Sequence, residues 1–264
     1  MNAWEHIQEQ ITKGALIVGN NSGGKDSQLL THLLGQRVPT KQLVIIHAEL
    51  PEADWPDATE HAERHAKLAG AHFIVARARK TFLEMVDQRF EKRPEVPSFP
   101  SAATRQCTSD LKRGPIEREI RRYAKANSFS IVVNCMGMRA AESSNRAKLV
   151  TWKKNENNSI AGREWFDALP IHELTTEEVF TGIKAAGQEP HPAYSLGNDR
   201  FSCMWCIYGS VPDLQNAAIA HPKVYAKFVG REKRTGYKLH MSRKSLEQLT
   251  GIKARVYLPI LEAA

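Results

Sequence analysis

A short stretch near the N-terminus has the residue types and the spacing with which proteins hold phosphate groups. Residues 18–27 read Val-Gly-Asn-Asn-Ser-Gly-Gly-Lys-Asp-Ser, between an apolar run at 15–18 and a helix-like run at 28–34. A strand that ends in a loop of small residues and continues as a helix presents backbone N–H groups and a helix N-terminus to an anion. The sequence therefore predicts a phosphate-binding loop, and the simpler alternative is a glycine-rich connection that binds no ligand.

Each side chain of this loop has a predicted part in anion binding. The glycines permit a tight turn and a close approach of the backbone, and the serines supply hydroxyl donors. The lysine adds a positive charge, and the aspartate can cap the first turn of the following helix. The residues are Ser22, Gly23, Gly24, Lys25, Asp26 and Ser27.

A second candidate for anion binding follows the apolar run at 130–135. Gly137 permits a turn at the end of a strand, and the planar guanidinium groups of Arg139 and Arg146 can contact phosphate or sulfate through paired hydrogen bonds. Without other motifs, solvated surface arginines are the more common interpretation of such a pattern.

The sequence has four cysteines, and two of them form the pair Cys203-x-x-Cys206. So few cysteines do not resemble a secreted disulfide framework, and they point to metal or thiol chemistry. A Cys-x-x-Cys pair alone fits zinc, a redox dithiol or an iron–sulfur cluster. Cys135 lies within an apolar strand pattern, so a packed thiol is its predicted role.

The elements that must position these residues alternate between strand and helix, which is typical of a doubly wound parallel α/β sheet. We expect a loop rich in proline at 91–104, a β-hairpin within 150–170, a helix from a capping box at Thr175 and Glu178, and a final strand at 255–258. We expect one nucleotide-binding domain at 1–210 and a basic, mostly helical extension at 211–264 packed on it. The strands are predicted at 15–18, 42–47, 71–76 and 130–135, and the earlier helices at 28–34, 55–69, 81–90 and 111–126.

The loop at 22–27 lacks the spacing of a Walker A motif or of a dinucleotide-binding fold. It resembles the PP-loop of the N-type ATP pyrophosphatases, and more closely that of the phosphoadenylyl-sulfate (PAPS) and adenylyl-sulfate (APS) reductase superfamily. The segments 137–146 and 170–206 are similar to further motifs of that superfamily in the same order. The resemblance implies an adenine nucleotide α hydrolase-like fold, with ATP, APS or PAPS bound by the loop and by Gly137, Arg139, Ser143 and Arg146.

The resemblance also implies a cofactor. Residues 105–116 resemble the region where adenylyl-sulfate reductases carry a Cys-Cys pair that binds a [4Fe–4S] cluster together with a distant Cys-x-x-Cys. Cys107 fits the first position of that pair, and Thr108 replaces the second. Cys107, Cys203 and Cys206 are then three cluster ligands, with the fourth position left to an external ligand or to Cys135. Half of a zinc site at Cys203 and Cys206 is the alternative.

The resemblance suggests sulfur transfer more than sulfate reduction. The thiol-dependent reductases attack sulfate with a cysteine in a C-terminal segment, and no cysteine follows Cys206 here. The motifs resemble ATP pyrophosphatases that activate an acceptor for sulfur insertion, including proteins of DNA phosphorothioation that work with a cysteine desulfurase. We expect ATP with Mg²⁺ at the loop, and Lys25, Arg139 and Arg146 stabilising the transferring group. An APS or PAPS reductase and a non-catalytic iron–sulfur sensor or nucleic-acid-binding module are the alternatives.

Composition agrees with an anionic partner but does not identify it. The 264 residues carry 37 Lys and Arg against 29 Asp and Glu, a formal net charge of +8, which favours nucleotides or nucleic acid. The sequence has no apolar signal region and no membrane span, so we expect a cytoplasmic protein. His191 stands between prolines, where a structural role is expected more than acid–base chemistry, and the acidic groups within 47–56 suit ribose, magnesium or a helix N-terminus. The sequence leaves a homo-oligomer open.

Overall fold

Strands and helices alternate along the first half of the chain, as the hydrophobic pattern predicts. The computed structural model describes residues 1–255. The strands are β1 Leu16–Asn20, β2 Leu43–Glu49, β3 His72–Arg77, β4 Ile131–Cys135, β5 Trp152–Lys154 and β6 Glu164–Ala168. The helices are α1 Ala3–Thr12, α2 Lys25–Arg37, α3 Ala58–Leu68, α4 Phe82–Lys92, α5 Gln106–Thr108, α6 Gly114–Ala126, α7 Ser144–Ala147, α8 Thr176–Ala185, α9 Val211–Ala220, α10 Pro222–Thr235 and α11 Leu246–Thr250.

The strands form one mostly parallel sheet. Within residues 1–255 it has six strands in the order β3-β2-β1-β4-β6-β5. Strand β1 pairs in parallel with both β2 and β4, and β4 pairs in parallel with β6. Only β5, the partner of β6 in the hairpin, runs antiparallel among the pairs described. The expected doubly wound α/β fold and the expected hairpin are therefore confirmed.

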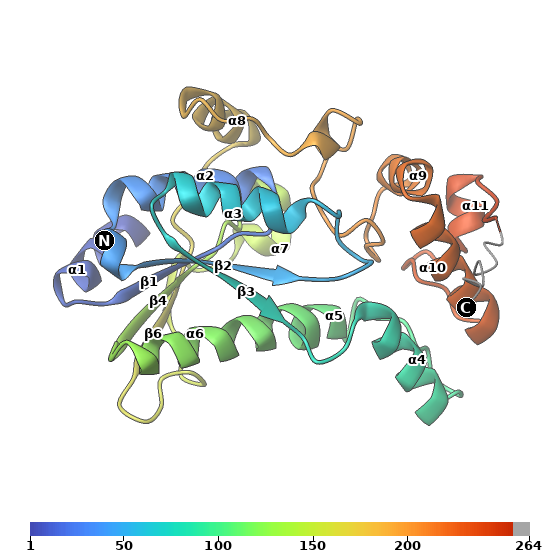
Figure 1. Cartoon of the computed structure of the whole chain (residues 1–264), viewed down its shortest axis with the longest axis horizontal. Coiled ribbons are helices and arrows are strands. Elements are labelled where there is room, and N and C mark those ends of the chain that lie inside the picture. Colours follow the sequence, from blue (N-terminus) through green and yellow to red (C-terminus); the bar gives the residue numbers. More distant parts are fainter. Residues whose placement is uncertain (256–264) are drawn as a thin grey trace, which may run out of the picture. The chain divides into compact units, whose positions relative to one another are not determined.

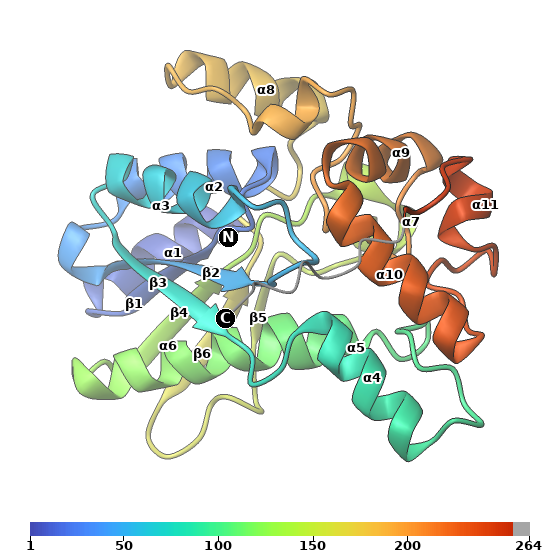
Figure 2. The ribbon, with the colours of Figure 1, turned by 45° about the vertical axis from the view of Figure 1, so that its right-hand side comes forward.

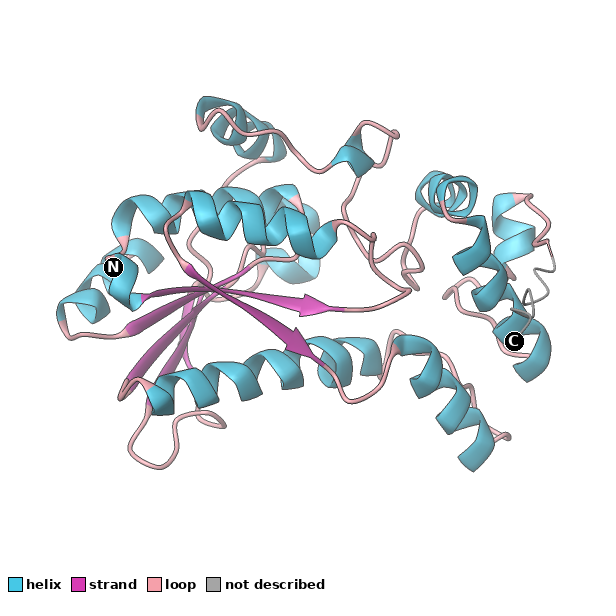
Figure 3. Cartoon of the chain, in the orientation of Figure 1, coloured by secondary structure: helices cyan, strands magenta, loops and turns pink. Residues whose placement is uncertain are grey.

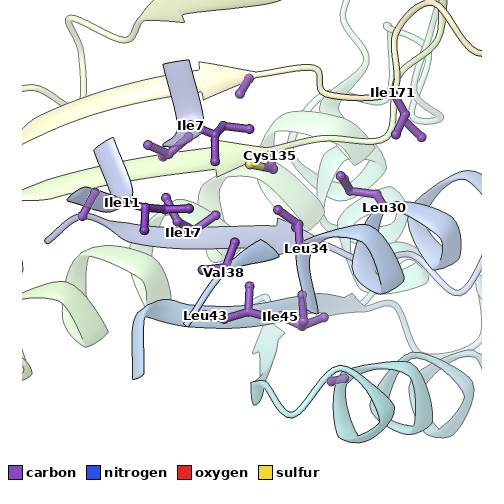
Figure 4. Packing of buried hydrophobic residues seen from close by; sticks show 14 residues of the cluster. Ile7, Ile11, Ile17, Leu30, Leu34, Val38, Leu43, Ile45, Cys135 and Ile171 are labelled. Atoms are coloured by element: carbon purple, nitrogen blue, oxygen red, sulfur yellow. The ribbon is translucent and has the colours of Figure 1, made fainter. Parts of the chain in front are cut away.

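Both faces of the sheet are covered by helices (Figures 1 and 3). Helices α2 and α3 lie on one face and α6 lies on the other. Successive side chains of a strand point to opposite faces. Ile17 accordingly packs with the helices of one face, among the residues drawn in Figure 4, while Leu16 and Val18 pack on the other. A strand buried on both sides reads as a continuous apolar run, which is why the sequence pattern was sufficient to find it.

Several helices begin at capping boxes that their sequences specify. Thr175 accepts a hydrogen bond from the backbone N–H of Glu178, and the Glu178 carboxylate accepts one from the N–H of Thr175. This pair confirms the predicted start of α8. Equivalent pairs at Asn2 and Thr81 start α1 and α4.

The chain divides into two compact units that both draw on distant parts of the sequence. The first contains the sheet with α1, α2, α3, α6, α7 and α8, and comprises residues 1–49, 57–77 and 112–191. The second comprises residues 50–56, 78–111 and 192–264. The predicted boundary at 210 falls inside the second unit, and the domain division predicted from the sequence stays a prediction.

The second unit is mostly helical and has an aromatic core of its own. Trp205 and Phe228 are buried with ring centroids 5.4 Å apart, and Phe82 of α4 lies 5.5 Å from Phe228 of α10. Figure 2 shows α9, α10 and α11 gathered beside one another. The stretch after α4 runs without regular structure up to α5, as the prolines predict. Of the predicted strand at 255–258, residues 256–258 lie outside the described residues.

None of the helices described is long and apolar enough to cross a membrane.

Candidate functional site

The predicted phosphate-binding loop connects β1 to α2 at a special position of the sheet. Strand β1 has β2 on one side and β4 on the other. The strand order therefore reverses between β1 and β4, and the loops that follow these two strands begin at this point. In open α/β sheets, ligands bind beyond the carboxyl ends of the strands at such a point. The loop after β1 and the loop after β4 are the two segments that the sequence analysis singled out for anion binding.

Backbone geometry of the loop suits an anion at the start of α2. Gly24 is the N-cap residue, and no side chain caps this end of the helix within the described residues. The first N–H groups of a helix lack partners inside the helix, which makes a helix start a favourable place for an anion. Gly23 has a φ of 85°, which a residue with a side chain adopts only with strain. Ser22 is exposed at the turn.

Asp26 does not have the capping role that the sequence predicts. It lies inside the first turn of α2, where its carboxylate is 3.0 Å from the Lys25 Nζ and 2.6 Å from the Arg139 Nε. The capping expectation was wrong because a guanidinium that is distant in sequence binds this carboxylate. Asp26 instead holds the two cations of the site together.

Arg139 is one of the largest fully buried side chains, with 1% of its surface exposed. Besides Asp26, it donates from Nη1 to the backbone oxygen of Leu174 at 2.8 Å and from Nη2 to Thr176 Oγ1 at 3.1 Å. Every nitrogen of the guanidinium therefore has a protein acceptor. Arg139 connects the loop after β4 to the start of α2 and to the start of α8.

Lys25 is 6% exposed and lies within the same unit as these groups. Its Nζ is 5.9 Å from the centroid of the Phe180 ring. The Asp26 carboxylate and the Phe180 face both attract an ammonium group. They hold the lysine charge beside the N-terminus of α2.

The other residues of the loop after β4 lie beside these groups. A Cβ built on Gly137 would be 3.1 Å from the Asp26 carbonyl carbon, so the backbones of the two loops are in contact. Ser143 caps α7 by accepting from the Arg146 backbone N–H at 3.2 Å. The Arg146 guanidinium pairs with Glu142 and keeps 34% of its side-chain surface exposed. Arg146 is thus more accessible to a ligand than Arg139.

A cluster of buried side chains contains His61, His65 and His191. His61 and His65 stack edge-on along α3 with ring centroids 4.3 Å apart, and His191 lies 4.9 Å from His61. Burial lowers the pKa of His61 to about 4 and that of His65 to about 3. His191 contacts Asp57 through Nε2 at 3.0 Å, and the structural role expected for it stays a prediction.

Two of the acidic groups predicted near the end of β2, Glu49 and Glu52, have partners within their own units. Glu49 binds the Arg77 guanidinium, with Oε2 2.5 Å from Nε. Glu52 belongs to the second unit, where it pairs with Lys227. A ribose or magnesium role for either carboxylate stays a prediction.

The cysteines fall into two groups. Cys135 is fully buried in β4, and burial raises the pKa of its thiol, as a packed thiol requires. Cys107, Cys203 and Cys206 are all partly exposed and all belong to the second unit. Among residues 1–255, however, no three His, Cys, Asp or Glu side chains are grouped so that they could hold a metal ion. As arranged here, the three thiols do not fit a shared cluster.

Two residues beside the loop, Asn21 and His65, were not predicted from the sequence. Asn21 is 2% exposed and its Oδ1 accepts from the Gly23 N–H at 2.8 Å, while its Nδ2 is 3.3 Å from His65 Nδ1. An asparagine that directly precedes a small-residue turn often bonds the local backbone, which was the available signal. Nothing in the sequence connects His65 to the loop.

The fold and the loop define a doubly wound α/β protein with a glycine turn and a helix N-terminus at the switch point of its sheet. Residues 17–209 match the phosphoadenosine phosphosulfate reductase domain family. The chain belongs to this family. The predicted membership of the PAPS reductase superfamily is therefore confirmed.

Individual relatives are more distant. An uncharacterized 37.8 kDa protein of Escherichia phage 186 is 31% identical over 129 residues, which are 49% of this chain and 37% of that protein. The chain spans about two fifths of the length of the curated relatives it matches, with 37% and 42% covered. The activities of longer proteins therefore do not transfer to this chain as findings.

Among the solved structures similar to this chain are two at 12% sequence identity. One is PAPS reductase from Candida auris in a phosphate complex, with a TM-score of 0.49 over 77% of this chain and 88% of that one. The other is the U34-tRNA thiolase NcsA from Methanococcus maripaludis with its [4Fe–4S] cluster, with a TM-score of 0.44 over 97% of this chain and 86% of that one. At this distance no activity transfers from either protein.

Proposed function

We propose that this chain is an ATP pyrophosphatase that binds an adenine nucleotide at residues 22–27 and adenylates an acceptor for sulfur transfer. One observation carries the proposal. The start of α2 has no side-chain cap, and the buried Lys25 lies beside it at the switch point of the sheet. The N–H groups of a helix N-terminus and a fixed cation are what a polyphosphate requires.

The cations of the site have different proposed parts. Lys25 is the first residue of α2, so it would neutralise the nucleotide phosphates. Arg146 pairs with Glu142 but stays partly exposed, so it can exchange that partner for a phosphate oxygen. Arg139 has no exposed nitrogen to offer, and we assign it to holding Asp26 and the two loops in place.

The reaction that fits this site is transfer of an adenylyl group. The acceptor oxygen attacks the α-phosphorus, the bond from that phosphorus to the bridging oxygen breaks, and pyrophosphate leaves with the bonding electrons. The proton of the acceptor goes to solvent. Positioned cations stabilise the negative charge that grows on the leaving group, which is the main protein contribution in such transfers. Mg²⁺ normally binds mainly through phosphate oxygens and water, and we expect it to arrive with the nucleotide.

Sulfur transfer to the adenylated acceptor, with DNA as a candidate acceptor and a cysteine desulfurase as donor, is the second half of the proposal. No step of it passes through a cluster here, because the three thiols are not grouped as ligands among the described residues. A [4Fe–4S] cluster at Cys107, Cys203 and Cys206 stays a prediction that iron, sulfide and zinc analysis after anaerobic purification would decide.

Substitution Lys25→Ala tests the proposed function. We expect it to weaken binding of ATP at least tenfold and to abolish pyrophosphate release, because the loop loses its buried charge. Calorimetry with ATP, APS and PAPS measures binding, and assays for pyrophosphate and sulfite measure turnover. Lys41→Ala, which removes an exposed lysine next to β2, is the matched control.

The outcomes separate the candidate functions. Pyrophosphate release from ATP supports the proposal, and sulfite release from APS or PAPS identifies a reductase instead. Tight binding with no turnover on any acceptor identifies a sensor. If Lys25→Ala binds nucleotides as well as the wild type does, the loop is not the nucleotide site.

A further inference from the structure

The main chain of Asn21 is held by hydrogen bonds to residues of β2. Its backbone N–H donates to the Ile46 carbonyl oxygen at 2.8 Å. Its own carbonyl oxygen lies 2.8 Å from His47 Nδ1. A carbonyl oxygen can only accept, so the His47 ring is the donor in this bond. The main chain of Asn21 is therefore tied to β2 on both sides.

The backbone N–H of Gly23 fixes which end of the Asn21 side-chain amide is the oxygen. The backbone N–H of Gly23 can only donate, and it lies 2.8 Å from one end of the amide. That end must be the oxygen Oδ1, which is also 3.1 Å from Ser27 Oγ. The amide oxygen therefore faces the anion-binding loop, and Nδ2 faces away from it.

The groups on the far side of the amide must therefore accept. The Thr31 hydroxyl donates its proton to the Ser27 carbonyl oxygen at 2.8 Å. Its oxygen therefore accepts the hydrogen bond from Asn21 Nδ2, which lies 3.0 Å away. The second proton of Nδ2 points to His65 Nδ1 at 3.3 Å. This nitrogen must carry a lone pair, which places the ring proton of neutral His65 on Nε2.

We propose that His65 is a positioning residue for the nucleotide loop, because the lone pair on its Nδ1 selects the Asn21 amide orientation that holds Gly23 and Ser27. A donor at this place would face the Asn21 N–H and favour the opposite amide orientation. Oδ1 would then leave Gly23, and the loop would lose the bond that fixes its turn. This inference rests on the proposed nucleotide function for its effect on ligand binding.

The surroundings of His65 keep the ring neutral. It is 3% exposed, and burial is the main cause that lowers its pKa to about 3. The charged and titratable groups that face it are His61 and Arg64 of its own helix and His191 of the segment after α8. All three disfavour a positive charge on the His65 ring. Asp57 lies at the far end of the cluster, in contact with His191. The acceptor on Nδ1 is thus present throughout the physiological range of pH.

His61 provides a matched control for packing. It lies one turn before His65 on α3 and is equally buried, at 4% exposed. Its Nε2 has no hydrogen-bond partner among the described residues, and none of its described contacts reaches the loop. A leucine at this position removes a buried imidazole from the same helix and leaves Asn21 untouched.

Three variants of the full chain test the inference, with ATP and inorganic pyrophosphate as the probes in calorimetry. His65→Leu removes the acceptor and should raise Kd for both probes about tenfold, the loss expected for one buried hydrogen bond. His65→Asn can place an amide oxygen where Nδ1 lies, so it should restore Kd to within about threefold of the wild type. His61→Leu should bind both probes as the wild type does.

A spectroscopic measurement reads the proton position directly. In the wild type, ¹⁵N NMR of the imidazole rings should show His65 as the neutral Nε2–H form with no titration between pH 5 and pH 8. A proton on Nδ1, or a ring that titrates in this range, would overturn the inference even where a variant fails to fold.

The remaining outcomes keep the two proposals apart. Unchanged binding in His65→Leu, or equal weakening in His61→Leu, would overturn the role of His65 while the nucleotide site stands. A wild-type chain that binds neither probe would refute the proposed function, and the NMR result would still decide whether His65 orients Asn21.

Discussion

The guanidinium of Arg139 is buried and is bound entirely by protein acceptors. Its three nitrogens donate hydrogen bonds to Asp26, to the Leu174 carbonyl oxygen and to Thr176. The ligand contact that the sequence suggests for this guanidinium is therefore replaced by contacts within the protein. A lysine would keep the charge but lose the planar fork that reaches three acceptors. We expect Arg139→Lys to lower the free energy of unfolding by about 1–3 kcal/mol, the usual cost of unpaired buried groups. Urea denaturation measures this loss.

A surface arginine controls for the change of residue type. Arg122 of α6 is mostly exposed, with 73% of its side-chain surface accessible, and Arg122→Lys should change the free energy of unfolding by less than about 0.5 kcal/mol. Equal effects of the two substitutions would show that the buried bonds of Arg139 contribute nothing measurable.

At the scale of elements, Gly137 sets how closely the loop after β4 approaches α2. A Cβ at this position would lie 3.1–3.2 Å from backbone atoms of Asp26 and Ser27, and backbone cannot move aside as a flexible side chain can. We expect Gly137→Ala to push the two loops apart, to destabilise the chain by about 1–3 kcal/mol and to weaken nucleotide binding. Thermal unfolding and calorimetry measure the two effects.

Gly230, in the second unit, is a glycine with room for a side chain. It lies inside α10, and a Cβ there would meet no described atom within 4 Å. Gly230→Ala should stabilise the chain by about 0.5–1 kcal/mol, because alanine loses less backbone freedom in a helix, and nucleotide binding should not change. If Gly137→Ala bound nucleotides normally, the approach of the two loops would have no part in the site.

For the whole molecule, the two units should respond to acid in opposite directions. In the first unit, His61 and His65 have pKa values of about 4 and 3, below the usual value near 6.5. The unfolded chain then binds more protons than the folded one, so stability falls as the pH drops through 6.5. Between pH 7.5 and pH 5.5 the loss should reach about 2–3 kcal/mol for the two groups together.

The second unit contains a buried carboxylate with the opposite sign. Glu232 is 1% exposed and accepts from the backbone N–H groups of Leu239 and Leu246. Burial raises its pKa, so the folded state binds the proton more readily and stability rises as the pH falls toward the unfolded value near 4.3. Hydrogen exchange read by mass spectrometry at pH 7.5 and pH 5.5 resolves the two units. Faster opening at pH 5.5 throughout the chain would contradict this prediction.

The sequence by itself determined the sheet, the hairpin, the start of α8 and the place of the loop. Each of these follows from local periodicity, small-residue turns or a capping pair, which act over a few residues. It also determined the family, because three motifs stand in order along the chain and the match covers residues 17–209.

Only the tertiary structure decided what the side chains of the site do. Asp26 binds Arg139 across 113 residues, which displaces the local capping role that its position in the loop suggests. His65 meets Asn21 because α3 packs against β2 and α2, and no sequence spacing encodes that contact. The grouping of 50–56 and 78–111 with 192–264 likewise depends on contacts between distant segments. Hydrogen bonds between such segments are chosen by packing of the whole fold, whereas strands, turns and caps are chosen by their own neighbours in the chain.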